Sequence, residues 1–190
     1  MSQPVVERFA LADVTPEIVE ASVTCHHRAF PKPRRTRDQR IAWISEQLAA
    51  GWPGRPNLSF HVVRDESGRH LAQAETFTRE IIIADEPLVV LALAGVCTDP
   101  DFRHKGLARA VVQAAFKPVD AGAPTHALFQ TSHPVQPFYE KLHAAVVENP
   151  WTNSRAEDPA ANPWWDDVVL HYPADRPWPM GPVDLQGPAW

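Results

Sequence analysis

The sequence is poor in cysteine and has no hydrophobic run long enough to cross a membrane. Cys25 and Cys97 are its only cysteines, too few for a disulfide framework and not placed at a metal-binding spacing. The longest apolar run, residues 88–97, covers about half of a membrane span. Residues 1–14 carry charges within their apolar stretch, unlike a signal peptide. We therefore expect a soluble, cytoplasmic protein that holds no metal.

An excess of positive charge is also missing. Lysine and arginine together number 18 against 23 acidic residues, which gives a formal net charge of −5. Nucleic acids and anionic membranes bind basic patches or arms, whereas the basic residues here are scattered along the chain. We expect neither a nucleic acid nor a membrane as a partner.

Proline and tryptophan are abundant, and they concentrate towards one end. The chain has 20 prolines and 7 tryptophans, and residues 151–190 hold five of the tryptophans. The same segment has two arginines against six acidic residues, a net charge of −4. With 190 residues, 44% of them hydrophobic, the chain suits one globular domain. We expect a core over residues 1–150 and an acidic, proline- and tryptophan-rich extension over residues 151–190 that packs on the same domain.

The hydrophobic pattern predicts an α/β fold of the α+β kind. Helices are expected over residues 16–30, 37–50, 105–116 and 135–143, with Pro118 ending the third. Strands are expected over residues 5–11, 59–64, 71–83, 88–98, 126–131, 144–148 and 168–172. Residues 88–98 are apolar on both faces, which is typical of a central strand. This order predicts a mixed, mostly antiparallel sheet of about seven strands, flanked by helices, with one parallel crossover.

A glycine at the start of a helix marks the most informative segment. Residues 96–109 read VCTDPDFRHKGLAR and join the central strand to the third helix. Gly106 lets backbone N–H groups approach a ligand, and the positive end of the helix dipole favours phosphate. Arg103, Lys105 and Arg109 add positive charge. The segment indicates a pyrophosphate cradle, although an ordinary surface helix explains the pattern Arg-x-x-Gly-x-Ala equally well when it is taken alone.

Together with the stretch FYEKL at residues 138–142, this segment resembles the GNAT superfamily of acyl-CoA N-acyltransferases. The resemblance is strongest over residues 88–147, and the element order before it agrees. It implies the GNAT fold, acetyl-CoA as co-substrate and direct acyl transfer. It also implies that acetyl-CoA contacts the end of the central strand and the loop after it, through Val96, Cys97, Thr98, Arg103, His104, Lys105, Gly106, Leu107, Ala108 and Arg109.

The same resemblance implies a catalytic acid. Tyr139 matches the family tyrosine that protonates the leaving thiolate. A phenol with a pKa of about 10 can share or give its proton to a thiolate whose thiol has a pKa of about 8.5. A rim aromatic with its hydroxyl in water is the alternative. His143 stands where many relatives have glycine, and we expect it to change the turn and not the chemistry.

The general base is harder to place, because residues 92–95 read ALAG where many relatives carry a carboxylate on the central strand. Glu75 on the neighbouring strand is the first candidate, and His133 is the second. A solvent-facing Glu75 explains its position equally well. The remaining residues of interest are interpreted as structural: Cys97 as a small core residue, His61, His126 and His171 as surface or hydrogen-bonded core residues, and His26 and His27 as unable to share one metal ion.

The acidic extension suggests where an acceptor amine binds. Its tryptophans and carboxylates suit a cationic, ring-containing amine, so Asp166 and Trp190 are the expected substrate-binding residues. Packing of these tryptophans in the core is the alternative. A C-terminal tryptophan and the element order also resemble the aminoglycoside 2′-N-acetyltransferase branch of GNAT, although Ala94 replaces the glutamate of that branch.

Two functions follow from these patterns. The first is an acetyl-CoA-dependent N-acetyltransferase acting on a small, cationic or aminoglycoside-like amine. The second is a non-catalytic acyl-CoA-binding sensor or interaction protein of the same fold, which the missing carboxylate favours, whereas Tyr139 and the complete cradle favour the enzyme. Acetylation of proteins would need an open peptide groove, which the extension is expected to close. We expect acetyl-CoA and a small amine as partners and leave a homodimer open.

Overall fold

The computed structural model describes residues 4–30 and 34–190, which form two compact units. The first unit comprises the described residues of Met1–Phe77 and Ala94–Ala115, and the second comprises Thr78–Leu93 and Phe116–Trp190. Strands β3 (His70–Ile83) and β4 (Glu86–Thr98) and helix α3 (Leu107–Asp120) each contribute residues to both units. Residues 151–190 lie wholly within the second unit.

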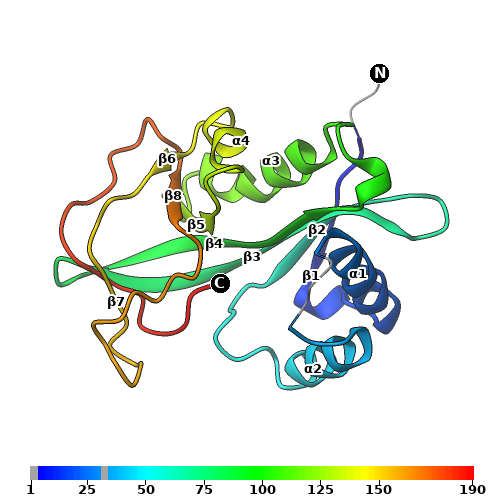
Figure 1. Ribbon diagram of the computed structural model, residues 1–190, viewed down its shortest axis with the longest axis horizontal. Helices are drawn as coiled ribbons and strands as arrows, with labels where there is room; N and C mark the ends of the chain where they lie inside the picture. Colours follow the sequence, from blue (N-terminus) through cyan, green and yellow to red (C-terminus); the bar gives the residue numbers. More distant parts are fainter. Residues whose placement is uncertain (1–3, 31–33) are drawn as a thin grey trace. The chain divides into compact units, whose positions relative to one another are not determined.

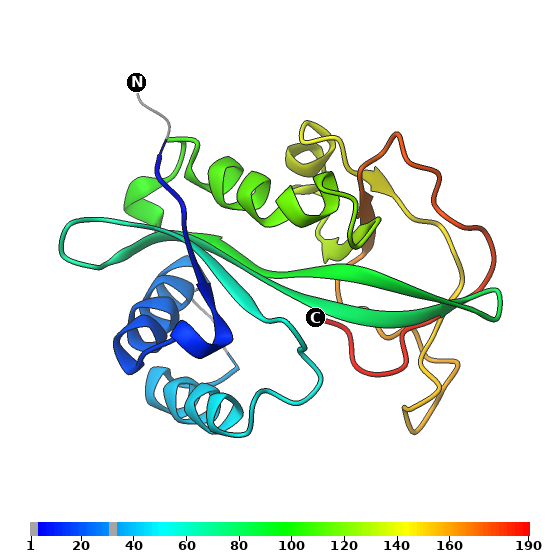
Figure 2. The same ribbon diagram turned by 180° about the vertical axis from the view of Figure 1, so that it is seen from behind.

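In the first unit, antiparallel strands carry two helices on one face. Strand β1 (Glu7–Ala10) pairs with β2 (Ser59–Arg64), and β2 pairs with the first part of β3. Helices α1 (Pro16–Ala29) and α2 (Arg37–Ala49) contact each other on one side of these strands, whereas the first turns of α3 lie on the other side (Figures 1 and 2). Two short 3-10 helices, η1 (Leu11–Asp13) and η2 (Pro100–Phe102), complete the unit.

The local sequence explains where the two N-terminal helices begin. Pro16 occupies the first turn of α1, where backbone N–H groups have no partner within the helix, so the N–H that proline lacks is not needed. Thr36 and Gln39 form a capping box at the start of α2, with hydrogen bonds of 3.3 and 3.0 Å. No helix formed by the described residues is long and apolar enough to cross a membrane.

In the second unit, β4 pairs in parallel with β5 (Ala127–Thr131). Strand β8 (Val168–Tyr172) pairs antiparallel with β5 and with β6 (Ala145–Val146), and helix α4 (Gln136–Glu140) follows β5 along the chain. Strand β9 (Val183–Asp184) pairs antiparallel with the end of β3 and parallel with β7 (Trp151–Thr152). The C-terminal segment is therefore built into the sheet of this unit.

The strand order is β1-β2-β3-β4-β5-β8-β6, with β9 beside β3 and β7 beside β9. The predicted fold class, a mixed and mostly antiparallel sheet flanked by helices, is confirmed. Strand β4 has neighbours on both sides, as its apolar sequence predicts.

Several elements differ from the sequence-based expectations. Helix α3 does not end before Pro118 but continues to Asp120, because a proline near the end of a helix removes one N–H donor while Ala121 N still donates to Lys117 O at 3.0 Å. Helix α4 and strand β6 are shorter than expected. Strands β7 and β9 are additional, because two-residue strands leave no period in the sequence.

Candidate functional site

Strand β4 is kinked at Gly95, in the first unit. Gly95 has a φ of +59°, and a Cβ added to it would lie 2.9 Å from Oε1 of Glu75. Real Cβ atoms do not approach an oxygen so closely, and L-residues rarely adopt this φ. The glycine therefore both bends the strand and leaves room for the Glu75 carboxylate directly over the bend.

Glu75 is buried and paired. Its side chain lies on β3 with 6% exposure, and Nη1 of Arg55 donates to Oε2 at 2.7 Å. The Arg55 guanidinium lies over the Trp52 ring at 5.2 Å and over the Phe77 ring at 4.8 Å. The ion pair holds Oε2, while Oε1 faces the kink at Gly95. The solvent-facing alternative for Glu75 is therefore wrong, because the carboxylate is inside the unit.

Asp99, directly after β4, anchors the end of the strand. Its fully buried carboxylate accepts hydrogen bonds from Arg28 Nε at 2.8 Å and from Arg69 Nη2 at 2.6 Å. Burial would raise the pKa of Asp99, but the hydrogen bonds from Arg28 and Arg69 outweigh burial and hold the pKa at about 2. Sequence reasoning missed this role, because the two arginines are distant in the chain and only a turn is visible at Asp99.

The loop after Asp99 leads into α3, and no protein atom fills the space beside its glycine. His104 and Gly106 have φ angles of +62° and +77°, and a Cβ on Gly106 would meet no atom within 4 Å. The first hydrogen bond of the helix runs from Ala110 N to Gly106 O, so the amides just after Gly106 have no partner within the helix. These amides and the positive end of a helix dipole fit a pyrophosphate.

Positive side chains flank this helix start. Arg103, Lys105 and Arg109 are exposed, and the Lys105 ammonium lies 4.6 Å from the centre of the Phe102 ring. Arg103 donates to the carbonyl of Ala29 at 3.4 Å. Cations at these positions suit a phosphate-rich ligand.

The last residues of β4 also fit a ligand. The hydroxyl oxygen of Thr98 is buried and makes no hydrogen bond to the protein, a costly state unless another group supplies the bond. Cys97 is 5% exposed, and its Sγ lies 3.7 Å from Sγ of Cys25. The hydrogen bond with Cys25 and burial raise the pKa of the Cys97 thiol, which keeps it protonated and supports its interpretation as a core residue.

Tyr139 lies in the second unit, on α4. It is 6% exposed, and its ring packs 4.7 Å from that of Phe129 and 4.9 Å from that of Phe138. Burial raises the pKa of its hydroxyl, and the charge of Asp166 raises it further. The phenol is therefore protonated across the neutral range, as a proton donor must be. The rim-aromatic alternative is wrong, because the ring is buried.

The two expected acceptor contacts, Asp166 and Trp190, lie in different environments within the C-terminal segment. Asp166 is half-buried and lines a cavity of about 450 Å³ in the second unit, with Glu148, Asp167 and His133 also in its wall. Burial and the neighbouring Asp167 raise the pKa of Asp166. Trp190, in contrast, is 7% exposed, and its indole N–H donates to the carbonyl of Leu128 at 3.1 Å. Trp190 is packed inside the unit, as the packing alternative predicts.

The histidines are mostly structural. His61 contacts Thr76 Oγ1 at 3.0 Å, and His126 contacts the carbonyl of Pro177 at 3.2 Å. Burial lowers the pKa of His171 to about 4, so the ring is neutral. His143 adopts a φ of +65°, so it keeps the left-handed turn that a glycine favours, contrary to the expected change of turn. The described part of the chain holds no group of three or more side chains arranged for a metal.

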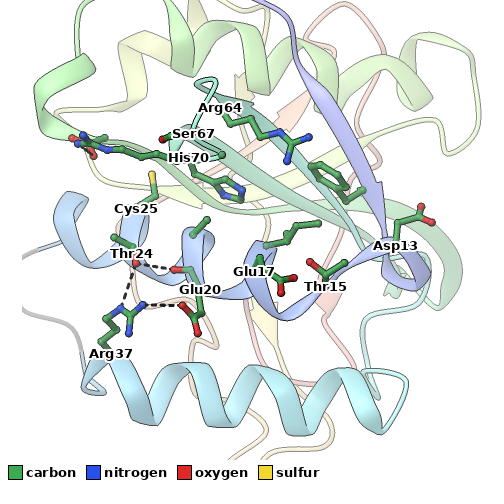
Figure 3. A pocket seen from close by; sticks show the side chains of 16 residues that line it. Asp13, Thr15, Glu17, Glu20, Thr24, Cys25, Arg37, Arg64, Ser67 and His70 are labelled. Carbon is green, nitrogen blue, oxygen red and sulfur yellow. Dashed lines mark hydrogen bonds and ion pairs between the residues drawn. The ribbon is translucent and has the colours of Figure 1, made fainter.

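A further cavity of about 600 Å³ lies in the first unit between α1 and the strands (Figure 3). Arg37 contacts Glu20 and Thr24 on the helix side, at 3.5 and 3.4 Å. Arg64 and Arg69 come from the strand side and pair with Glu7 and Asp99. The arginines of this cavity are thus already neutralised. No sequence motif marks it, because its lining comes from separate segments.

Comparisons with known proteins agree on the fold. A family model described as an acetyltransferase (GNAT) domain matches residues 11–147. A GNAT family N-acetyltransferase (YhbS) from Escherichia coli, solved in complex with CoA, superimposes with a TM-score of 0.62 at 10% identity, covering 98% of this chain and 92% of that one. No curated protein shows significant sequence similarity to the chain.

Two more solved structures are similar. An acyl-CoA N-acyltransferase from Pseudomonas aeruginosa has a TM-score of 0.59 at 11% identity, over 89% of this chain and 99% of that one. A GNAT family acetyltransferase from Staphylococcus aureus has a TM-score of 0.57 at 10% identity, over 90% of this chain and 100% of that one. At these identities the likeness is one of fold.

Proposed function

This chain belongs to the GNAT acetyltransferase family, and from that premise we propose that it transfers the acetyl group of acetyl-CoA to the amine of a small acceptor. The observation that carries the proposal is the loop between β4 and α3. It combines the open space at Gly106, amides at the helix start without a partner inside the helix, and three exposed cations. The pyrophosphate of acetyl-CoA is the group that this combination suits best.

In the proposed reaction the acceptor amine attacks as a neutral nucleophile. Its nitrogen forms a bond to the acetyl carbonyl carbon, and the bond from that carbon to the CoA sulfur breaks. Glu75 takes the proton that the amine loses, directly or through a water molecule, and Tyr139 gives a proton to the departing thiolate. Main-chain groups of Val96, Cys97 and Thr98 hold the pantetheine arm and the acetyl carbonyl.

The position of Glu75 supports its role as the base. Residues 92–95 lack the carboxylate that many relatives carry, but Oε1 of Glu75 faces the kink of the same strand from its neighbour. A carboxylate is thus present beside β4 although β4 does not supply it. This observation favours the enzyme over the alternative, an acyl-CoA-binding sensor without turnover. His133, exposed on the second unit, is the second candidate base.

The acceptor is proposed only as a small amine. A cationic, aminoglycoside-like acceptor is supported by the carboxylates around Asp166, whereas the burial of Trp190 removes the aromatic surface on which a ring was expected to stack. We treat the cationic acceptor as the alternative, and the likeness to the aminoglycoside 2′-N-acetyltransferase branch stays a prediction.

The experiment that tests the proposal has two parts. Calorimetry measures acetyl-CoA binding to the wild type and to Gly106→Glu, which adds bulk and negative charge to the loop, with Gly122→Glu as a control at another positive-φ glycine. Release of the CoA thiol is then followed over a panel of amines. Binding lost only in Gly106→Glu, with amine-dependent thiol release, supports the enzyme. Binding without release from any amine supports the sensor, and equal binding by both variants contradicts the proposed cradle.

A further inference from the structure

A cluster of arginines and aromatic rings surrounds Glu75 in the first unit. The Arg35 guanidinium lies 4.9 Å from the centre of the Trp43 ring, and Trp43 packs edge-on against Trp52 at 5.7 Å. The guanidinium of Arg55 lies 5.2 Å from the centre of the Trp52 ring, and it forms the ion pair with Glu75. The contacts bring two guanidinium groups and two indole rings together beside the proposed base.

Arg40, on α2, adds a third positive charge to this cluster. It lies on the same face of α2 as Trp43, three residues earlier. Its side chain is half-buried, its Nε is buried without a hydrogen bond, and no carboxylate of residues 4–30 and 34–190 lies within 4.0 Å of its guanidinium. Burial lowers the pKa of Arg40 and the charge of Glu75 opposes the shift, but an arginine remains protonated at neutral pH.

The cluster therefore has more positive than negative charge. Among the described residues, Glu75 is the carboxylate whose charge acts on Arg40, and Arg55 already occupies one of the oxygens of Glu75. His26 contributes no charge, because burial lowers its pKa to about 4. A partly buried cation without an anion costs free energy, and an arginine fork matches the oxygens of a carboxylate or phosphate.

We propose that Arg40, with Arg35 and Arg55, binds an anionic group of the acceptor, a carboxylate or a phosphate carried by the same molecule as the reacting amine. The inference rests on the proposed function and names its substrate class. Trp43, which is half-buried, offers its ring to the part between the two groups, and the buried Trp52 packs against it edge-on. An acceptor held at its anion by Arg40 presents its amine on the side where Glu75 takes the proton.

The first test uses pairs of amines that differ only in the anionic group: L-alanine with L-alaninamide, and phosphoethanolamine with ethanolamine. An aminoglycoside is included as a cationic acceptor for comparison. We expect the wild type to use one anionic member with a kcat/KM at least about 10-fold above that of its neutral partner. The pair that shows this preference distinguishes a carboxylate from a phosphate. Arg40→Gln should raise KM for that member by about 10- to 100-fold, the usual size of a lost charged hydrogen bond.

The controls separate binding from folding. Arg37→Gln changes the same residue type one turn earlier on α2, where the side chain is exposed and contacts Glu20, and it should leave both members of each pair unchanged. Arg40→Lys keeps the positive charge but loses the paired N–H donors of the guanidinium, so its KM for the anionic amine should lie between those of the wild type and Arg40→Gln. Acetyl-CoA affinity should be the same in all of these variants.

A second measurement does not depend on turnover. Inorganic phosphate should raise the Tm of the wild type more than that of Arg40→Gln, with Arg37→Gln like the wild type. Phosphate at the Gly106 loop contributes equally to every variant, so the difference reports on Arg40. An equal rise in Arg40→Gln, equal use of neutral and anionic amines, or preference for the aminoglycoside overturns the inference and leaves the proposed function intact. Arg40-dependent phosphate binding without thiol release from any amine contradicts the proposed function instead.

Discussion

Glu75 and Gly95 fit each other so closely that the backbone bend of β4 and the position of the carboxylate depend on one another. A Cβ on Gly95 would lie 2.9 Å from Oε1 and 3.1 Å from Cδ of Glu75. Glu75 cannot retreat easily, because Arg55 holds its other oxygen at 2.7 Å.

Gly95→Ala should therefore impair both stability and turnover. The substitution places a side chain at a φ of +59° and against the carboxylate, which should cost about 1–3 kcal/mol of unfolding free energy. Gly122→Ala is the matched control, because Gly122 also has a positive φ but has open space around it and lies outside the proposed site. Denaturant unfolding and thiol release measure the two effects. Equal losses in both variants would show that strain alone matters.

Glu75→Gln should remove the base and keep the shape. We expect kcat to fall by about 10²- to 10⁴-fold, with acetyl-CoA affinity unchanged in calorimetry. Glu46→Gln, an exposed change on α2, should have no effect. If Glu75→Gln turns over like the wild type, the same assay on His133→Asn becomes the test of the second candidate.

Tyr139→Phe should lower kcat by about 10- to 10³-fold through loss of the proton donor. The ring contacts with Phe129 and Phe138 are kept, so the Tm should hardly change. The other tyrosine, Tyr172, donates to Asp120 at 2.6 Å, and Tyr172→Phe should leave kcat unaltered. Because burial raises the pKa of Tyr139, wild-type turnover should show no loss at pH 9–10 through its ionisation. Weaker acetyl-CoA binding at normal kcat would make the hydroxyl a binding group.

The ion pairs of Asp99 should make the stability of the fold fall at acidic pH. The folded-state pKa of about 2 lies below the ordinary value of 3.8, so the carboxylate stabilises the fold above about pH 4, and this contribution is lost as the pH falls towards 2. Asp99→Asn should lower the Tm at pH 7, with a difference from the wild type that narrows over that range. Asp38→Asn, at a carboxylate with 93% exposure, is the control. A constant difference from pH 7 to pH 2 would contradict the assigned ion pairs.

Two tryptophans of the C-terminal segment should behave differently. Trp190 is 7% exposed and Trp165 is 60% exposed. Trp190→Ala should cost about 3–5 kcal/mol of unfolding free energy, whereas Trp165→Ala should stay within about 1 kcal/mol. An acceptor KM that rises in Trp190→Ala at an unchanged Tm would instead restore its predicted role as an acceptor contact.

The conformation of the proposed cradle could be predicted from the sequence because it depends on neighbouring residues. Gly106 and the start of α3 are adjacent in the chain, and a glycine at a helix start has the same conformational freedom in any context. The apolar run of β4 likewise predicts a strand with neighbours on both sides. Pro118 shows the limit of local rules, since the hydrogen bonds after it allow α3 to continue.

By itself the sequence determined the order of the main elements, the central strand and the open glycine turn before α3, because hydrophobic period and glycine conformation act over a few residues. Only the tertiary structure decided which charges are compensated and which side chains are buried. Glu75 meets Arg55 across 20 residues, Asp99 meets Arg28 across 71, and Trp190 meets Leu128 across 62. Arg37 and Arg40 lie one turn apart on α2, yet Arg37 is exposed and paired with Glu20, whereas Arg40 is half-buried and has no carboxylate partner among the described residues. Burial and electrostatic pairing depend on residues far away in the chain, so no local pattern can reveal them.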